Sequence, residues 1–214
     1  GMYFDHDIFL VAFSNLIAEI NPNTFEILRT WSDPLFNDIH GIHRVENEVF
    51  VSNCGNESID ILNISNGVVE RIDLLGDDLR SIRPSTNRIS DTKPHLHHIS
   101  DIIKTKENQI LISLVRQGRI FNLNEWKWIG PRFSSPPHDL ISGIDDTIWL
   151  TTVDGGVHRI FSEGKKKTWS LENYQQYIGW TRGLAITNDG FLVGTTAIRS
   201  SNSDYFQSFI SSSI

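Results

Sequence analysis

The chain of 214 residues has a single cysteine, Cys54, so no disulfide can form within it. It therefore shows no sign of the oxidising compartments in which secreted proteins acquire disulfides. No apolar run approaches the roughly 18 residues that a membrane-spanning helix needs. The first residues, Met2 to Asp7, also lack the basic segment that is typical of a targeting peptide. These absences predict a soluble, cytoplasmic protein with no membrane as a partner.

Positive charge is also in short supply. Lys and Arg number 19 against 26 Asp and Glu, which gives a formal net charge of −7. Because nucleic-acid binding rests on neutralising phosphates with basic side chains, this balance argues against DNA or RNA as a partner. Alanine is scarce, whereas six Trp and twelve Phe are spread along the chain, often beside Val, Ile or Thr. This composition favours β-strands over helices.

An apolar four-residue segment recurs at intervals of about forty residues. Its copies begin 41, 61, 38 and 43 residues apart, and they are Ile8–Val11, Val49–Ser52, Ile110–Ser113, Ile148–Thr151 and Phe191–Gly194. A turn of charged or amide residues precedes four of these segments, and another short apolar strand precedes each of those turns. A third strand follows every copy, and a fourth follows the first four copies. Four short antiparallel strands per repeat of about forty residues are typical of a β-propeller blade.

The repeat predicts an all-β fold, a β-propeller of about five four-stranded blades in which the terminal blades are incomplete. One domain spans residues 1–214, with blades at approximately 7–34, 37–75, 98–130, 137–172 and 181–212. The first blade lacks its innermost strand and the last its outermost strand. Closure then requires an unrecognised terminal strand, a second copy of the chain or further sequence. The long step places an insertion loop at 76–97, interpreted either as a lid or as a surface loop.

A polar residue stands at the start of each complete innermost strand. Counting nine positions back, without gaps, from the first residue of each later apolar segment reaches His40, Asp101, Asp139 and Arg182. The innermost strands of a propeller line its central channel, so we expect these four side chains to gather at one mouth of the channel. Neighbouring positions add His98, His138 and Trp180. The ends of the apolar segments add Asn53, Arg116, Asp154 and Arg199.

These side chains suit a polar or anionic ligand, because Arg can bind a carboxylate or phosphate through two parallel hydrogen bonds. The set predicted to bind the ligand is His40, His98, Asp101, His138, Asp139, Trp180, Arg182 and Arg199. The alternative is structural, since His and Asp at these positions also hold neighbouring backbone together.

Three histidines lie close together in the segment His95–His98, and imidazole nitrogens bind zinc and related ions. Arg182 occupies one of the four equivalent strand starts, however, so an axial site of four histidines would need a ligand from elsewhere. We therefore expect no metal and no other cofactor, and we interpret this segment as a hydrated loop. Cys54 is expected to be a thiol of the core or of a strand end.

Several segments of the last two blades carry a family resemblance. Gly179–Ala185, Leu192–Thr196 and Ile198-Arg199, together with Pro137–Leu140, resemble a bacterial family of propeller-like domains of unknown function. More loosely, the repeats are similar to gluconolactonase-like and NHL-like propellers, although a matching set of acidic and amide metal ligands is missing. The resemblance implies the propeller fold and a polar, Arg-containing channel mouth. It implies no established activity and no catalytic residue.

Three functions are compatible with the sequence. The first is a module that binds a saccharide, an acidic metabolite or a partner protein at the channel mouth. The second is an enzyme of lyase or hydrolase type. Its candidate catalytic residues are His40, His98 and His138 as general base, Asp101 and Asp139 to orient that base, and Arg182 to stabilise negative charge. The third is a scaffold that displays surfaces, in one version as a homo-oligomer.

Overall fold

The structure is a computed structural model that describes residues 1–5, 7–74, 96–143, 145–162, 164–173 and 179–196. In these ranges the chain consists mainly of β-strands, with short 3-10 turns at Cys54–Asn56 (η1) and Leu171–Asn173 (η3). No helix within the described ranges is long and apolar enough to cross a membrane.

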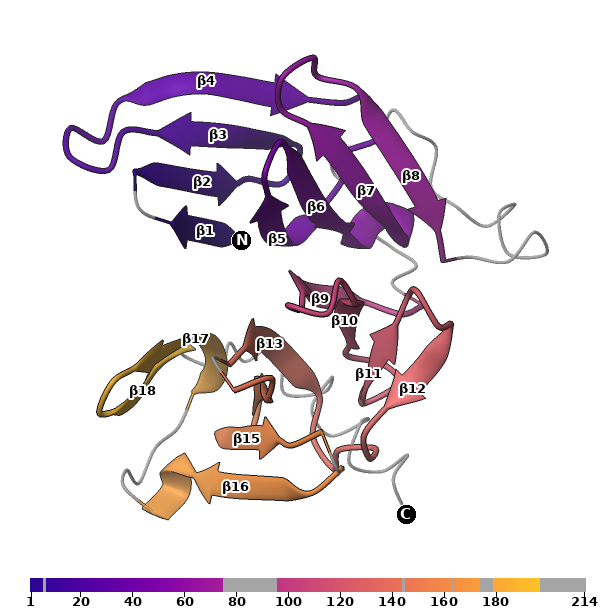
Figure 1. The fold of residues 1–214 in the computed structure, drawn as a ribbon, viewed down its shortest axis with the longest axis vertical. Helices are drawn as coiled ribbons and strands as arrows, with labels where there is room; N and C mark the ends of the chain where they lie inside the picture. The colour runs from indigo at the N-terminus through magenta and orange to yellow at the C-terminus, as the bar shows by residue number, and fades with distance from the viewer. Residues whose placement is uncertain (6, 75–95, 144, 163, 174–178, 197–214) are drawn as a thin grey trace. The chain divides into compact units, whose positions relative to one another are not determined.

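Four sheets each contain four strands that pair with their neighbours in chain order (Figure 1). The first sheet contains β1 (Met2–Asp5), β2 (Ile8–Ala12), β3 (Leu16–Ile20) and β4 (Ile27–Ser32). The second contains β5 (Ile39–Val45), β6 (Glu48–Asn53), β7 (Ser58–Asn63) and β8 (Val69–Asp73). The third contains β9 (Ile99–Lys104), β10 (Ile110–Leu114), β11 (Arg119–Asn122) and β12 (Lys127–Ile129). The fourth contains β13 (Pro137–Ser142), β14 (Ile148–Thr152), β15 (Gly156–Ile160) and β16 (Lys166–Ser170), and β17 (Trp180–Thr187) pairs with β18 (Gly190–Thr196) in a fifth, two-stranded sheet.

The predicted all-β architecture of four-stranded blades is confirmed, and one detail differs. Met2–Asp5 forms β1 and pairs antiparallel with β2, with Met2 opposite Val11 and Asp5 opposite Ile8. The first blade is therefore complete. Its innermost strand was missed because β1 is short and largely exposed, so it has no buried apolar run. The third strand expected in the fifth blade and residues 76–95 of the expected insertion loop lie outside the described residues.

Side chains with amide or carboxylate groups close the turns between strands. Asn21 Oδ1 accepts the backbone N–H groups of Asn23 (2.9 Å) and Thr24 (3.2 Å) in the turn before β4. Asp145 Oδ1 accepts the hydroxyl of Thr147 (2.7 Å) in the turn before β14. Such residues favour turns because their side chains accept hydrogen bonds from nearby backbone or side-chain donors that are not paired within the sheet. The sequence signal that separated the strands thus has a direct physical cause.

The chain divides into two compact units, residues 1–103 and 104–214. In the first unit, the sheets β1–β4 and β5–β8 share one hydrophobic core. Its fully or nearly fully buried members are Leu10, Ile17, Phe36, Ile39, Ile42, Val49, Val51, Leu62 and Ile64. Because both sheets bury apolar side chains in the same cluster, the two blades stabilise one another by removing apolar surface from water.

In the second unit, an aromatic cluster joins the two-stranded sheet to the fourth sheet. The Trp149 and Trp169 rings stack with centroids 5.3 Å apart, and Phe191 on β18 lies 5.9 Å and 5.5 Å from them. Arg159 lies over Trp149 at 5.2 Å and Lys167 over Trp169 at 4.7 Å, which covers the rings with cations. The cluster fixes β17 and β18 against the fourth blade.

Candidate functional site

Three innermost strands begin with the same backbone irregularity. The register of β5 and β6 shifts between Ile39 and Ile42, so that His40 and Gly41 lie opposite Ser52 alone. The same two-against-one pairing sets His138 and Asp139 opposite Thr151, and Arg182 and Gly183 opposite Gly194. These are β-bulges, which re-aim side chains and are over-represented beside active sites.

The bulges define which positions correspond to one another. His40, His138 and Arg182 stand at the first bulge position, and Gly41, Asp139 and Gly183 at the second. Ungapped counting along the sequence had instead aligned Asp139 with His40 and Arg182. This count was wrong by one residue in the fourth blade. The turn between β13 and β14, across which Ser142 pairs with Ile148, is one residue longer than the corresponding turns between β5 and β6 and between β17 and β18.

In the first unit, the bulge of β5 lies against Asp101 of β9. A Cβ atom on Gly41 would lie 2.3 Å from Asp101 Oδ1 and 2.7 Å from Asp101 Cα, so this close approach requires a glycine. The Gly41 N–H donates to Ser52 Oγ (2.5 Å), and the Ser52 hydroxyl donates to the Gly41 carbonyl (3.1 Å). The His40 and His98 rings meet edge to face with centroids 4.9 Å apart. The structure thus brings His40, His98 and Asp101 together.

In the second unit, the bulge of β13 places a histidine beside a carboxylate. His138 Nδ1 lies 3.3 Å from Asp139 Oδ1, and both side chains are mostly buried. The Thr151 hydroxyl donates to Asp139 Oδ2 (2.6 Å), and the Gly183 N–H also donates to this carboxylate. The His138 carbonyl accepts the Ser113 hydroxyl at 2.7 Å. Strands β10, β13, β14 and β17 are therefore linked at this point.

The ionisation of Asp139 follows from these contacts. Burial is the largest single influence and acts to raise its pKa, because a charged carboxylate loses hydration. The hydrogen bond and positive charge of His138, with the Thr151 and Gly183 donors, together outweigh burial and lower the pKa below its ordinary value. Asp139 is therefore an anion at neutral pH, suited to orient His138 and unsuited to donate a proton.

Arg182 is the exposed cation of the second unit's site. Its guanidinium carbon lies 5.1 Å from the centre of the Trp180 ring, an arrangement in which an aromatic face supports a cation. Thr181 between them is buried, and Gly183 has a positive φ of 84° that a residue with a side chain adopts only with strain. The Gly183 bond to Asp139 ties this segment to the His138 bulge.

The ligand set predicted from the sequence divides between the two units. His40, His98 and Asp101 belong to residues 1–103, whereas His138, Asp139, Trp180 and Arg182 belong to residues 104–214. Arg199 lies outside the described residues. Gathering of all these side chains at one channel mouth stays a prediction. Among the strand-end candidates, Asp154 is engaged locally, because its Oδ1 accepts the Thr152 hydroxyl (2.6 Å) and the Gly156 N–H (3.3 Å).

Cys54 is fully buried at the start of η1, directly after β6, which confirms the expected thiol of the core or of a strand end. Sequence reasoning missed that two histidines lie beside it. Ligand atoms of His40, Cys54 and His98 all lie within 4.8 Å of one another, which makes this trio able to hold a metal ion. A signal was present, since Cys54 directly follows Asn53, one of the strand-end positions expected beside the innermost strands.

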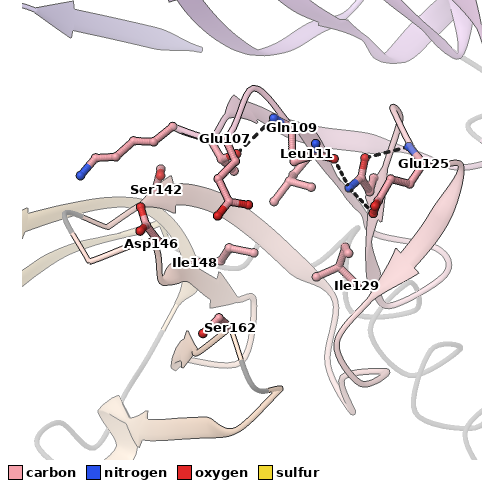
Figure 2. A pocket seen from close by; sticks show the side chains of 12 residues that line it. Glu107, Gln109, Leu111, Glu125, Ile129, Ser142, Asp146, Ile148 and Ser162 are labelled. Atoms are coloured by element: carbon pink, nitrogen blue, oxygen red, sulfur yellow. Dashed lines mark hydrogen bonds between the residues drawn. The ribbon is translucent and has the colours of Figure 1, made fainter.

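A separate pocket of 290 Å³ lies at the other end of the strands of the second unit (Figure 2). Residues of the turns between strands line much of it, including Glu107, Glu125 and Asp146, together with Ser142. Ser142 ends β13, whereas the His138 bulge begins it. The pocket therefore belongs to the opposite end of the blade from the bulges, where the sequence predicted no site.

The repeated four-stranded sheets define this protein as a β-propeller. No protein-family model matches the chain, and no curated protein sequence matches it. Among solved structures, it is similar to virginiamycin B lyase from Staphylococcus aureus, with a TM-score of 0.62 and 15% identity over 92% of this chain and 65% of that one. It is also similar to a protein of unknown function from Bacteroides caccae, with a TM-score of 0.66 and 12% identity over 93% of this chain and 70% of that one.

These likenesses concern the fold. A streptogramin B lyase structure gives a TM-score of 0.60 and 13% identity over 94% of this chain and 69% of that one. The chain thus spans only about two thirds of the length of these neighbours, and 65% in the case of the S. aureus lyase. The expected resemblance to propeller-like proteins is confirmed at this level, and one of the neighbours is itself a protein of unknown function.

Proposed function

We propose that the chain is a propeller module that binds a small anionic ligand, a sugar acid or another acidic metabolite, at the bulged starts of its innermost strands. The observation that carries the proposal is the pairing of Arg182, supported on Trp180, with the neighbouring His138–Asp139 bulge. Both bulges present a nitrogen-bearing side chain at their first position, and the Gly183–Asp139 hydrogen bond joins them.

The charges of this site favour an anion. The guanidinium of Arg182 is exposed and offers paired donors that match a carboxylate or phosphate. Asp139 would repel an anion if its charge were unmatched, but His138, Thr151 and the Gly183 N–H already surround it. The Trp180 ring adds an apolar face against which a sugar ring could stack. A polar, carboxylate-bearing saccharide fits these features better than an apolar molecule does.

An enzyme of lyase type is the second candidate, and one observation favours it. His138 Nδ1 lies 3.3 Å from the ionised Asp139, which is the arrangement of a general base and the carboxylate that orients it. Arg182 would then stabilise negative charge on the substrate. Both lyase structures named above share this fold. In this reading His138→Ala removes turnover of an acidic saccharide but leaves its binding largely in place, because Arg182 remains.

Thermal unfolding in the presence of defined anions tests the proposal. Glucuronate and citrate are the probes, and glucose is the neutral control. A ligand at a hundredfold excess over its Kd stabilises the folded state by about 2.7 kcal/mol, which raises the Tm of a chain of this size by roughly 5–10 °C. We expect such a rise with at least one acidic probe and none with glucose.

Two arginine variants make the test specific. Arg182→Ala should abolish the rise in Tm, whereas Arg29→Ala should keep it, because Arg29 is 51% exposed and lies on β4 of the first unit, outside the three bulges. Equal stabilisation of both variants would show that the anion binds elsewhere and would remove the basis of the proposal. Absence of any stabilisation across an expanded panel of sugar acids, dicarboxylates and phosphate esters would do the same.

A further inference from the structure

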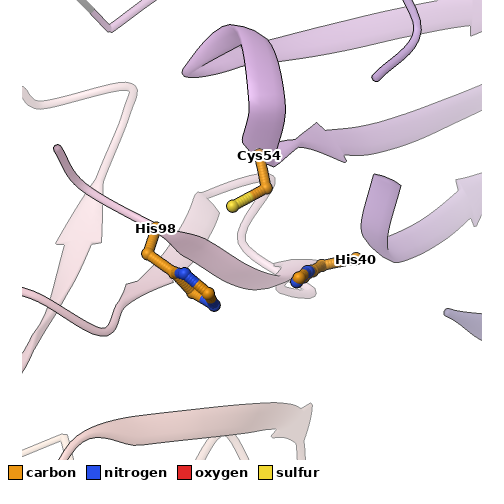
Figure 3. Close-up of side chains that lie close together, drawn as sticks. All are labelled: His40, Cys54 and His98. Atoms are coloured by element: carbon orange, nitrogen blue, oxygen red, sulfur yellow. The ribbon is translucent and has the colours of Figure 1, made fainter. Parts of the chain in front are cut away.

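The trio of His40, Cys54 and His98 belongs to the first unit, whereas the anion site proposed above uses residues of the second unit. Cys54 is fully buried, and the two histidines are half-buried on either side of it (Figure 3). Their ligand atoms all lie within 4.8 Å of one another. Three residues with nitrogen and sulfur donors, drawn from three separate segments, therefore surround one small space.

We propose that His40, Cys54 and His98 form a binding site for a transition-metal ion, with Zn²⁺ as the occupant. Two imidazoles and one thiolate are the ligands that zinc and its softer neighbours prefer, whereas Mg²⁺ and Ca²⁺ require oxygen ligands. Tetrahedral zinc with bonds of about 2.0–2.3 Å brings its ligand atoms to about 3.3–3.8 Å from one another. Side-chain rotations that close the trio by about 1 Å reach this geometry.

The backbone holds the three ligand-bearing segments together without the ion. The Cys54 N–H donates to the carbonyl of Asp38, two residues before His40, at 3.2 Å. The carboxylate of Glu57, which is 1% exposed and follows η1, accepts the N–H of His97 at 3.0 Å. Cys54 is thus connected on one side to the segment of His40 and on the other to the segment of His98. A site prepared in this way loses little conformational entropy on binding.

Local backbone conformation supports a dedicated arrangement. Asp38, Glu57 and His98 all have positive φ angles, of 53°, 53° and 52°, although none is a glycine. Residues in this region carry strain, and such residues cluster at ligand clamps and active sites. The bulge of β5 adds to this, because it sets the direction of His40. Four adjustments of the backbone therefore surround the three candidate ligands.

The charges around the trio match a divalent ion with one open position. Binding releases the proton of the Cys54 thiol, so two neutral imidazoles, one thiolate and Zn²⁺ leave a net charge of +1. Asp38 Oδ2 lies 4.0 Å from His40 Nε2, which is longer than a hydrogen bond, and its negative charge beside the site favours a cation. Three protein ligands leave the fourth position to water or an anion, as in catalytic zinc sites.

Cobalt titration tests the site directly. The full chain is treated with a chelator, kept reduced without added thiols and titrated with Co²⁺. We expect one ion per chain and a sulfur-to-cobalt charge-transfer absorption in the near ultraviolet, which only a bound thiolate produces. Zn²⁺ should then displace the cobalt and bleach the absorption. A wild-type titration that shows no such absorption overturns the proposal by itself.

Variants locate the ion. Cys54→Ser should remove the charge-transfer absorption, and His98→Gln should weaken zinc affinity by at least the ~10–100-fold that changes beyond the first ligands cost. His43→Gln is the matched control, because this histidine lies on the same strand as His40 but packs against Tyr3 with centroids 5.5 Å apart. Circular dichroism verifies that each variant is folded. Should Cys54→Ser unfold, His98→Gln carries the comparison.

Two outcomes contradict the assignment at the level of the variants. If zinc affinity stays unchanged in His98→Gln, the ion binds elsewhere. The same conclusion follows if His43→Gln weakens zinc affinity as much as His98→Gln does. The Arg182→Ala variant distinguishes this proposal from the anion site, since it should keep the cobalt spectrum while losing stabilisation by glucuronate. Failure of one proposal therefore leaves the other intact.

Discussion

Replacing Asp60 by alanine tests whether a buried ion pair holds the second blade together. Asp60 on β7 is fully buried and accepts hydrogen bonds from Asn53 Nδ2 (2.7 Å), Ser58 Oγ (2.9 Å), Arg71 Nε (2.6 Å) and Arg71 Nη2 (2.7 Å). Arg71 on β8 also reaches Asp33 at 3.3 Å. The carboxylate thus connects three strands with the segment that leads into them.

The expected cost follows from what Asp60→Ala leaves behind. Arg71 is only 19% exposed, so the variant leaves a largely buried guanidinium with Asp33 as its remaining carboxylate partner. Breaking a buried pair on one side costs about 3–5 kcal/mol. The pair of Arg29 and Glu19 has the same chemistry and a distance of 2.5 Å, but its arginine is 51% exposed and its glutamate 15% exposed. Because the arginine is half in water, Arg29→Ala should cost less, about 1–2 kcal/mol including the lost contact of Arg29 with Trp31.

Urea unfolding followed by tryptophan fluorescence measures both losses. The double variant Asp60→Leu/Arg71→Met separates the two causes, because replacing both charges by apolar groups of similar size is often close to neutral. We expect the order wild type, then the double variant or Arg29→Ala, then Asp60→Ala as the least stable. If Asp60→Ala lost no more stability than Arg29→Ala, burial would not be what makes this ion pair important, and the reasoning would be refuted.

Two further predictions concern packing and pH. Gly41→Ala should lower the free energy of unfolding by about 1–3 kcal/mol, because its Cβ meets Asp101 Cα at 2.7 Å. Gly190→Ala, with no atom within 4 Å, should change it by less than about 0.5 kcal/mol in the same urea titration, and equal effects would contradict the packing argument. Burial, with a smaller effect of Lys166, lowers the pKa of His158 to about 4. As the pH is lowered, the unfolded chain therefore binds the proton first. The free energy of unfolding should fall by about 1.4 kcal/mol per pH unit as the pH drops from about 6.5 to 4. The stability of His158→Gln should show a shallower pH dependence, and an unchanged slope would show that His158 does not titrate as described.

Periodicity in the sequence was sufficient to predict the blades. The apolar segments recur about every forty residues and lie in largely buried strands such as β6 and β10, and turn residues such as Asn21 and Asp145 separate the strands for local hydrogen-bonding reasons. The strand β1 escaped because exposure of Met2 and Phe4 gives it no such pattern. The structure identifies β1 by its hydrogen bonds to β2, and its own residues carry no pattern that predicts a strand.

The candidate site was predictable only in outline. Asp139 and Arg182 were singled out by spacing and His138 as a neighbour of Asp139, but a bulge adds one residue to one strand without any signal in composition. The approach of Cys54 to His40 and His98 depends on contacts between residues far apart in the chain, such as Glu57 with His97. Spacing between sequence positions contains no information about such a contact.

The bulges explain how one backbone device can carry different chemistry in each blade. An extra residue leaves backbone groups that need partners, and the residue opposite the bulge meets this need. Ser52 bonds both backbone groups of Gly41, and Thr151 accepts the N–H of Asp139 while donating to its carboxylate. In the third bulge Gly194 has no side chain, and a Cβ there would lie 2.5 Å from the Arg182 carbonyl, so close backbone approach replaces the hydroxyl. None of these three contacts uses the side chain of the first position, which contacts the Asp139 carboxylate in the case of His138 and lies over the Trp180 ring in the case of Arg182. The backbone of the third bulge therefore does not depend on the guanidinium, which is why Arg182→Ala should remove anion binding while leaving the unfolding midpoint of the ligand-free protein nearly unchanged.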